Sequence, residues 1–146
     1  MKSVTNINLS RLLAGGVLAG VVVAAITGLA NSTLLSRDFS AWASELGNHL
    51  HPPDQPIQLS LWTVRSILDG LAGVWIYASI RPGGGPRTAL IAALFVWAVG
   101  RLGVALDLIA LGVFPMRIVL GQSAVGMIAI VSGVWIGSWI YAPPEA

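Results

Sequence analysis

The sequence contains no cysteine, and only 10% of its 146 residues are charged. The absence of cysteine excludes disulfides, thiolate nucleophiles and cysteine-based metal sites. An ordinary soluble domain carries about 25% charged residues, so this low charge argues against a surface that faces water. The net charge of +2 is small and scattered, which argues against nucleic acid as a partner. Because 55% of the residues are hydrophobic, we expect the lipid bilayer to be the main solvent.

Four long apolar stretches dominate the chain. They cover residues 12–30, 57–80, 88–112 and 116–141, and each reaches the ~20 residues that a bilayer crossing requires. In lipid the backbone must satisfy its own hydrogen bonds, so each stretch is predicted to be a helix. The predicted fold class is all-α: an integral membrane four-helix bundle that forms a single domain over residues 1–146. The first stretch also resembles a signal peptide, but its apolar run is long for one, so we expect a retained helix.

The longest polar segment, residues 31–56, separates the first two stretches. Within it, residues 36–50 place Phe39, Trp42, Ala43 and Leu46 at i, i+3, i+4 and i+7, which is the spacing of one helix face. This pattern predicts a short amphipathic helix that lies in the membrane interface.

Basic residues in the short loops predict the orientation of the chain. Four of them fall on one side of the predicted membrane and two on the other: Lys2, Arg11, Arg81 and Arg87 against Arg37 and Arg117. Because lysine and arginine are enriched in cytoplasmic loops, both termini are predicted to be cytoplasmic. The amphipathic helix is then extracytoplasmic, and the location is the inner (cytoplasmic) membrane.

The segment that joins the second and third stretches is the most distinctive in the sequence. Residues 73–89 read GVWIYASIRPGGGPRTA, and Trp97 follows. This pattern, Trp-x-Tyr-Ala-x-Ile-Arg-Pro and then a Gly/Pro turn, resembles a group of small four-helix bacterial membrane proteins of unassigned function. The resemblance spans most of the chain and implies the fold, but it implies no activity, cofactor or partner. The chain departs from the group at Arg101, where a neutral or aromatic residue is expected.

Three ionisable residues fall deep inside the predicted membrane: Arg65 and Asp69 in the second stretch and Arg101 in the third. At about 1.5 Å per residue they lie roughly 16 to 22 Å from the inner helix ends. Arg65 and Asp69 are four residues apart and are expected to pair, while Arg101 reaches Asp69 from the neighbouring helix. Gln122 and Ser123 fall at a comparable depth, and we call these five residues the polar layer.

The polar layer has two arginines and one aspartate, so it carries a surplus positive charge. An anion, a lipid phosphate or a carboxylate of a partner protein would neutralise it. Three roles are open: fixing the register of the helices, binding a ligand or ion, and docking a charged group of a partner. The first is favoured, because buried charges in membranes are usually paired within the bundle. Asp107 and Arg117, near the outer turn, are expected to pair with each other.

A second group of polar residues lies in the last turns of the predicted amphipathic helix and just after it, and consists of Glu45, His49, His51 and Asp54. Their oxygen and nitrogen atoms are possible metal ligands, but the spacing matches no strong metal motif. We therefore expect a solvated helix end rather than a metal site. The sequence identifies no cofactor.

Small residues recur every four positions in the first and last stretches: Gly16, Gly20, Ala24 and Gly28, and Ala129, Gly133 and Gly137. Such faces let helix backbones approach closely in lipid. They serve packing within the bundle or association with another protein. The first helix is expected to face outward, because it has no deep charge to bury.

No enzyme signature is present in the sequence: there is no paired carboxylate set and no nucleophile with a base at the same depth. A non-catalytic accessory or scaffolding subunit is therefore the favoured function, with other subunits of a larger membrane protein assembly as partners. The alternative is a small transporter or channel that recognises an anion or ion through the polar layer.

Overall fold

The computed structural model describes residues 7–46, 54–80, 84–112 and 114–141, and these are almost entirely helical. The elements are α1 (Leu9–Thr33), α2 (Ser36–Leu46), α3 (Gln55–Ile80), α4 (Gly85–Trp97), the π-helical turn η2 (Ala98–Leu102), α5 (Gly103–Ala110) and α6 (Met116–Tyr141). The prediction of an all-α chain is confirmed, since the described residues form no strand.

Three helical segments of the described chain are long and apolar enough to cross a membrane: Leu9–Thr33, Gly85–Ala110 and Met116–Tyr141. The last two correspond to the third and fourth apolar stretches of the sequence. The helix α3 has 26 residues but is not among these segments. It carries Arg65 and Asp69 in its middle, and both charges lower its apolar character.

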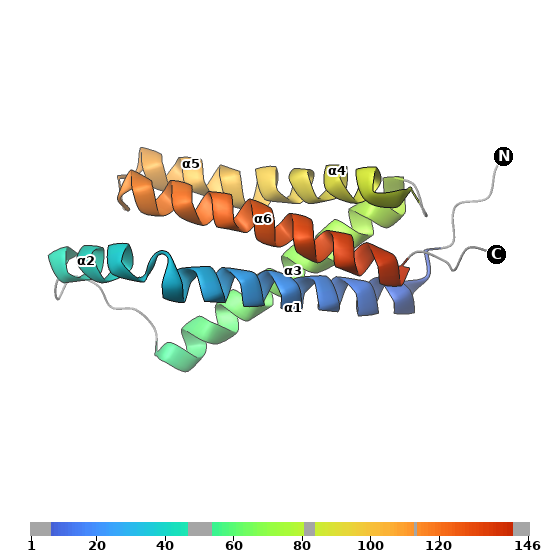
Figure 1. The fold of residues 1–146 in the computed structure, drawn as a ribbon, viewed down its shortest axis with the longest axis horizontal. Coiled ribbons are helices and arrows are strands. Elements are labelled where there is room, and N and C mark those ends of the chain that lie inside the picture. Colours follow the sequence, from blue (N-terminus) through green and yellow to red (C-terminus); the bar gives the residue numbers. More distant parts are fainter. Residues whose placement is uncertain (1–6, 47–53, 81–83, 113, 142–146) are drawn as a thin grey trace.

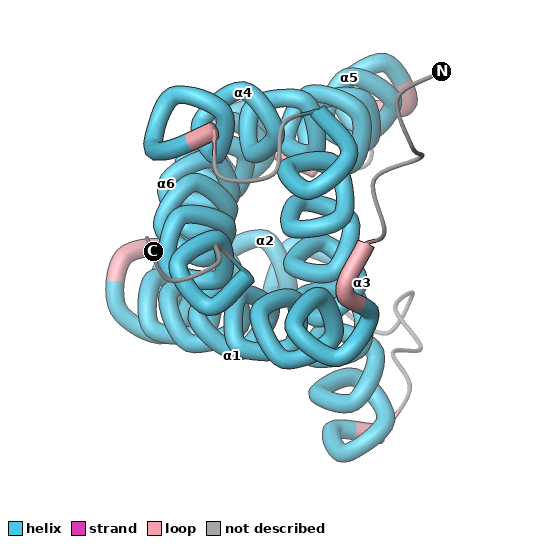
Figure 2. Tube along the Cα trace, turned by 90° about the vertical axis from the view of Figure 1, so that its right-hand side faces the viewer, coloured by secondary structure: helices cyan, strands magenta, loops and turns pink. Residues whose placement is uncertain are grey.

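The long helices run side by side, and the molecule has two distinct ends (Figure 1). The helix α1 begins and α6 ends at one of them, where Tyr77 and Tyr141 pack edge to face with ring centroids 6.2 Å apart. We call this the tyrosine end. The helix α2 lies at the opposite end, which we call the α2 end. In the end-on view of Figure 2, α1, α3, α4 and α6 surround a common axis.

The helix α1 is the central packing element, because it contacts both α3 and α6 along its length. A Cβ atom at Gly20 would meet the backbone of Ile67 on α3, and one at Gly133 on α6 would lie 2.6 Å from the Ala19 carbonyl oxygen. The expectation that the first helix faces outward is therefore wrong. Its small residues face α3 and α6, while larger side chains such as Leu13 and Val21 are exposed on the other side of the helix.

The helix α3 crosses the others obliquely (Figure 1). It packs against α4 near the tyrosine end, but towards Gln55 it diverges from α5, with which it makes at most isolated contacts. The diverging part exposes large apolar side chains, among them Leu61 and Val64. This divergence determines where the molecule is closely packed and where it is open.

Candidate functional site

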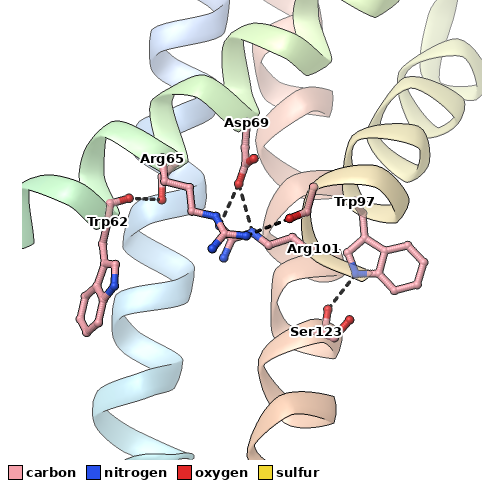
Figure 3. A network of polar contacts seen from close by, with 8 residues as sticks. Trp62, Arg65, Asp69, Trp97, Arg101 and Ser123 are labelled. Atoms are coloured by element: carbon pink, nitrogen blue, oxygen red, sulfur yellow. Dashed lines mark hydrogen bonds and ion pairs between the residues drawn. The ribbon is translucent and has the colours of Figure 1, made fainter. Parts of the chain in front are cut away.

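The centre of the polar layer is an ion pair between α3 and η2. Arg101 donates from Nη2 and from Nε to the same oxygen of Asp69, Oδ2, over 2.8 and 3.1 Å. The two side chains are only 13% and 12% exposed. Breaking such a buried pair costs far more than breaking one on the surface, because the remaining charge loses its compensation. Figure 3 shows Arg101 reaching across to Asp69, with Arg65 one turn away on α3.

Arg65 does not pair with Asp69, although the two are four residues apart. Its Nη2 donates instead to the backbone carbonyl of Gly100 in η2 over 2.9 Å. The expected i, i+4 pair is therefore wrong, because Arg101 already occupies Asp69. Arg65 is partly buried, and no carboxylate of the described residues lies within ion-pair distance of it.

The π-helical turn η2 carries both Arg101 and the Gly100 carbonyl oxygen that accepts the hydrogen bond from Arg65. In a π-helical turn one additional residue is accommodated, which rotates the flanking side chains by roughly 100° relative to a continuous α-helix. Gly126 on α6 lies against the Arg101 side chain, and a Cβ there would be in ordinary contact with it, 3.5 Å from its Cδ. The sequence prediction missed this turn, and the only signal for it is the pair of glycines, Gly100 and Gly103, around Arg101.

The two polar-layer residues of α6 lie beside this centre. The indole Nε1 of Trp97 donates to the Ser123 carbonyl oxygen over 2.9 Å, which ties α4 to α6. The side chain of Ser123 is buried, and that of Gln122 is partly buried. Thus the structure brings together Arg65, Asp69, Arg101 and the Gln122–Ser123 pair on three helical segments.

A cavity of about 290 Å³ opens directly beside the polar layer, on its α2 side. Its walls come from α1, α2, α3, η2, α5 and α6, and the polar-layer residues in the lining are Arg65, Arg101, Gln122 and Ser123. Most of the remaining lining is apolar, including Leu59, Val104 and Ile118. Concave sites with apolar walls and a few convergent polar groups are the usual form of a small-molecule site.

Three buried oxygens of the cavity residues lack a hydrogen-bond partner within the part of the chain that the structure describes. They are Thr27 Oγ1, Asn31 Oδ1 and Ser123 Oγ. Buried polar atoms are nearly always hydrogen-bonded, because an unpaired one costs about 1 to 3 kcal/mol. All three oxygens belong to residues that line the same cavity, although each oxygen itself exposes less than 1 Å² of surface.

The helix α2 lies against the α2 end of the cavity. Phe39 contributes to the lining, and Trp42 stacks on Phe114 with ring centroids 4.2 Å apart. An exposed ion pair of 3.5 Å joins Arg117 Nε to Asp38 Oδ2. The expected pair between Asp107 and Arg117 is therefore wrong, because α2 brings Asp38 closer to Arg117.

The small-residue face of α1 divides into two parts with different surroundings. Gly16 and Gly20 pack against Leu71 and Ile67 of α3, whereas Ala24 and Gly28 line the cavity. A Cβ atom at Gly28 would have no atom of the described chain within 4 Å. On α6, Gly133 and Gly137 pack against α1.

Of the four possible metal ligands, two lie within the described residues. Glu45 is exposed near the end of α2, and Asp54 is exposed just before α3. His49 and His51 lie outside the described residues. Within the described ranges, no three residues of metal-ligand type form a cluster.

Comparisons of the chain with protein-family models, with curated proteins and with solved structures find no match.

Proposed function

We propose that this protein crosses the inner membrane with four helices, α3 being the additional crossing. The two charged residues in the middle of α3, Arg65 and Asp69, bond to η2. On the same helix, Leu61, Val64 and Leu68 are more than half exposed. An outward apolar face with inward charges is what a lipid-facing helix requires. The basic-residue bias supports cytoplasmic locations for the start of α1 and the end of α6, and an extracytoplasmic location for α2.

Cysteine labelling tests this topology, because the natural chain has no cysteine. We expect Ser44→Cys in α2 to react with a membrane-impermeant maleimide in intact cells, and Gly84→Cys to react only after lysis. Labelling of Gly84→Cys in intact cells would reverse the orientation.

The function that the geometry supports best is non-catalytic binding of a small amphipathic ligand in the cavity. One observation carries this proposal: a cavity of about 290 Å³ combines mostly apolar walls with Arg65, which has no carboxylate within ion-pair distance among the described residues. A polar layer that only fixed helix register would satisfy its own polar groups and leave no space beside them. Ligand binding is also the first step in transport, the alternative that the sequence offers.

The accessory-subunit function is the weaker proposal. It depends on small-residue faces being available to another protein, but Gly16, Gly20, Gly133 and Gly137 are used in contacts between α1, α3 and α6. A partner would have to bind the remaining apolar surface, which lipid also covers.

Filling the cavity tests the binding function. Gly28→Leu on α1 and Ala105→Leu on α5 add bulk from two walls, and Ala25→Leu adds the same bulk to an exposed position of α1 that does not line the cavity. Unfolding is followed by tryptophan fluorescence in phosphatidylcholine nanodiscs, with and without dodecanol and dodecanoate. We expect amphiphile to raise the Tm of the wild type and of Ala25→Leu, but not of either cavity variant. An equal rise in all four proteins would contradict the proposal.

A further inference from the structure

Arg65 is the one cavity arginine whose charge has no carboxylate partner among the described residues. Arg101 uses two of its N–H groups on Asp69, whereas Arg65 uses one N–H on the neutral Gly100 carbonyl. A guanidinium has five N–H donors, so most of those on Arg65 remain for another acceptor.

The cavity opens sideways between α3 and α5. Leu59 and Trp62 on α3 and Val104 on α5 all line it, yet they are 63%, 59% and 41% exposed. These apolar side chains therefore belong both to the cavity wall and to the outer surface. The oblique course of α3 produces this opening, because α3 leaves α5 on the α2 side of the polar layer (Figure 1). If the helices cross a bilayer, such an opening faces lipid rather than water.

We infer that the ligand is a single-chain anionic amphiphile that enters from the lipid between α3 and α5. Its carboxylate or phosphate accepts charge-assisted hydrogen bonds from Arg65, and its chain lies along the apolar wall that includes Val104 and Ile118. This inference rests on the proposed binding function and adds the charge of the ligand, the residue that recognises it and the route of entry.

An anion suits this site better than a neutral polar group. Arg65 is held partly out of water, where hydrogen bonds to a charged acceptor are roughly twice as strong as those between neutral groups. The bound anion neutralises the surplus charge of the layer without disturbing Asp69, which keeps its own arginine. The pair of Asp69 and Arg101 thus positions the site, and Arg65 recognises the ligand.

The test compares ligands that differ in charge or in chain. Wild-type protein in phosphatidylcholine nanodiscs is titrated with dodecanoate, dodecyl phosphate, dodecanol, acetate and inorganic phosphate, and apparent affinities are taken from the ligand-dependent Tm. We expect the two long-chain anions to bind about tenfold or more tightly than dodecanol, because a charge-assisted bond is involved. Acetate and inorganic phosphate, which lack the chain, should have no effect.

The variant Arg65→Gln should abolish this preference, so that dodecanoate binds no better than dodecanol, and Arg65→Lys should restore part of it. Arg117→Gln, at an exposed arginine outside the cavity, is the matched control and should behave as wild type. Full preference in Arg65→Gln, or its absence in the wild type, would overturn the inference. Binding of inorganic phosphate as tight as that of dodecyl phosphate would overturn entry from the lipid.

These results also separate the inference from the proposed function. If dodecanol and dodecanoate bind equally in the wild type and Gly28→Leu abolishes both, the cavity binds amphiphiles but does not select anions. If no amphiphile raises the Tm, or if Gly28→Leu leaves binding unchanged, the binding function itself is wrong and the inference is overturned with it.

Discussion

The tyrosine end and the α2 end are built from the same long helices, but they are packed in opposite ways. Towards the tyrosine end, small residues bring α1, α3 and α6 into backbone contact, and Val74, Ala78 and Val134 are fully buried. Towards the α2 end, α3 diverges and leaves a cavity with charged and unpaired polar groups. The comparison indicates that close packing fixes the bundle at one end so that a site can be open at the other.

The regular face of α1 shows this difference most directly. Its four small residues have the same spacing. Gly16 and Gly20 pack against α3, whereas Ala24 and Gly28 line the cavity. A small residue that permits helix contact in one half therefore becomes part of a cavity wall in the other. The same substitution made in the two halves should therefore affect stability to very different extents.

The largest effect is expected for Gly20→Leu. A side chain there would meet the backbone of Ile67, which cannot move without separating α1 from α3. We expect a loss of about 3 kcal/mol or more, seen as a large fall in Tm or as failure to recover folded protein. Gly28→Leu is the matched control on the same face and should keep the Tm near that of the wild type. Equal losses in both variants would show that the two halves are not packed differently.

The next effect is expected for Asp69→Asn, which leaves Arg101 buried without its counter-charge. Complete burial would make the loss about 3 to 5 kcal/mol, and the neighbouring cavity reduces it to about 2 kcal/mol. The exposed Asp107→Asn should change stability by less than about 0.5 kcal/mol. Unfolding of both variants in nanodiscs gives the comparison. Combining Asp69→Asn with Arg101→Leu should recover part of the loss, and no recovery would mean that the pair is not coupled.

The sequence is sufficient to predict the helices and the level of the charged residues, but not how the helices pack or where the cavity lies. Helix formation follows from the length and apolarity of the stretches, and the depth estimate correctly places Arg65, Asp69 and Arg101 at one level. The sequence could not predict which arginine pairs with Asp69, because both Arg65 and Arg101 are at the level of this single carboxylate. The pairing with Arg101 depends on the π-helical turn at residues 98–102. The cavity arises from the angle of α3, a property of packing that periodicity does not encode.

A smaller effect is expected for Trp97→Phe, which removes the hydrogen bond to the Ser123 carbonyl but keeps the aromatic ring. The expected loss is about 1 kcal/mol, the usual contribution of one such bond. Trp75→Phe makes the same change at a side chain that is 56% exposed, and should be nearly neutral. Thermal unfolding of the two variants and the wild type gives the Tm values to compare. If both have the same Tm, the indole bond does not hold α4 to α6.

The smallest effect is expected for the second arginine–aspartate pair, which sharpens the comparison because it has the same chemistry as the buried one. Arg117 is 85% exposed and lies 3.5 Å from Asp38, whereas Arg101 is 13% exposed and lies 2.8 Å from Asp69. Exposed ion pairs contribute about 0 to 1 kcal/mol and are screened by salt. Arg117→Gln should therefore cost less than about 0.5 kcal/mol, and the cost should vanish at 1 M NaCl. The cost of Asp69→Asn should fall much less at that salt concentration, because both side chains of the pair are mostly buried between helices. If both losses fall equally with added salt, the Arg101–Asp69 pair is as open to water as the exposed pair, and the difference between a buried ion pair and an available arginine at position 65 no longer holds.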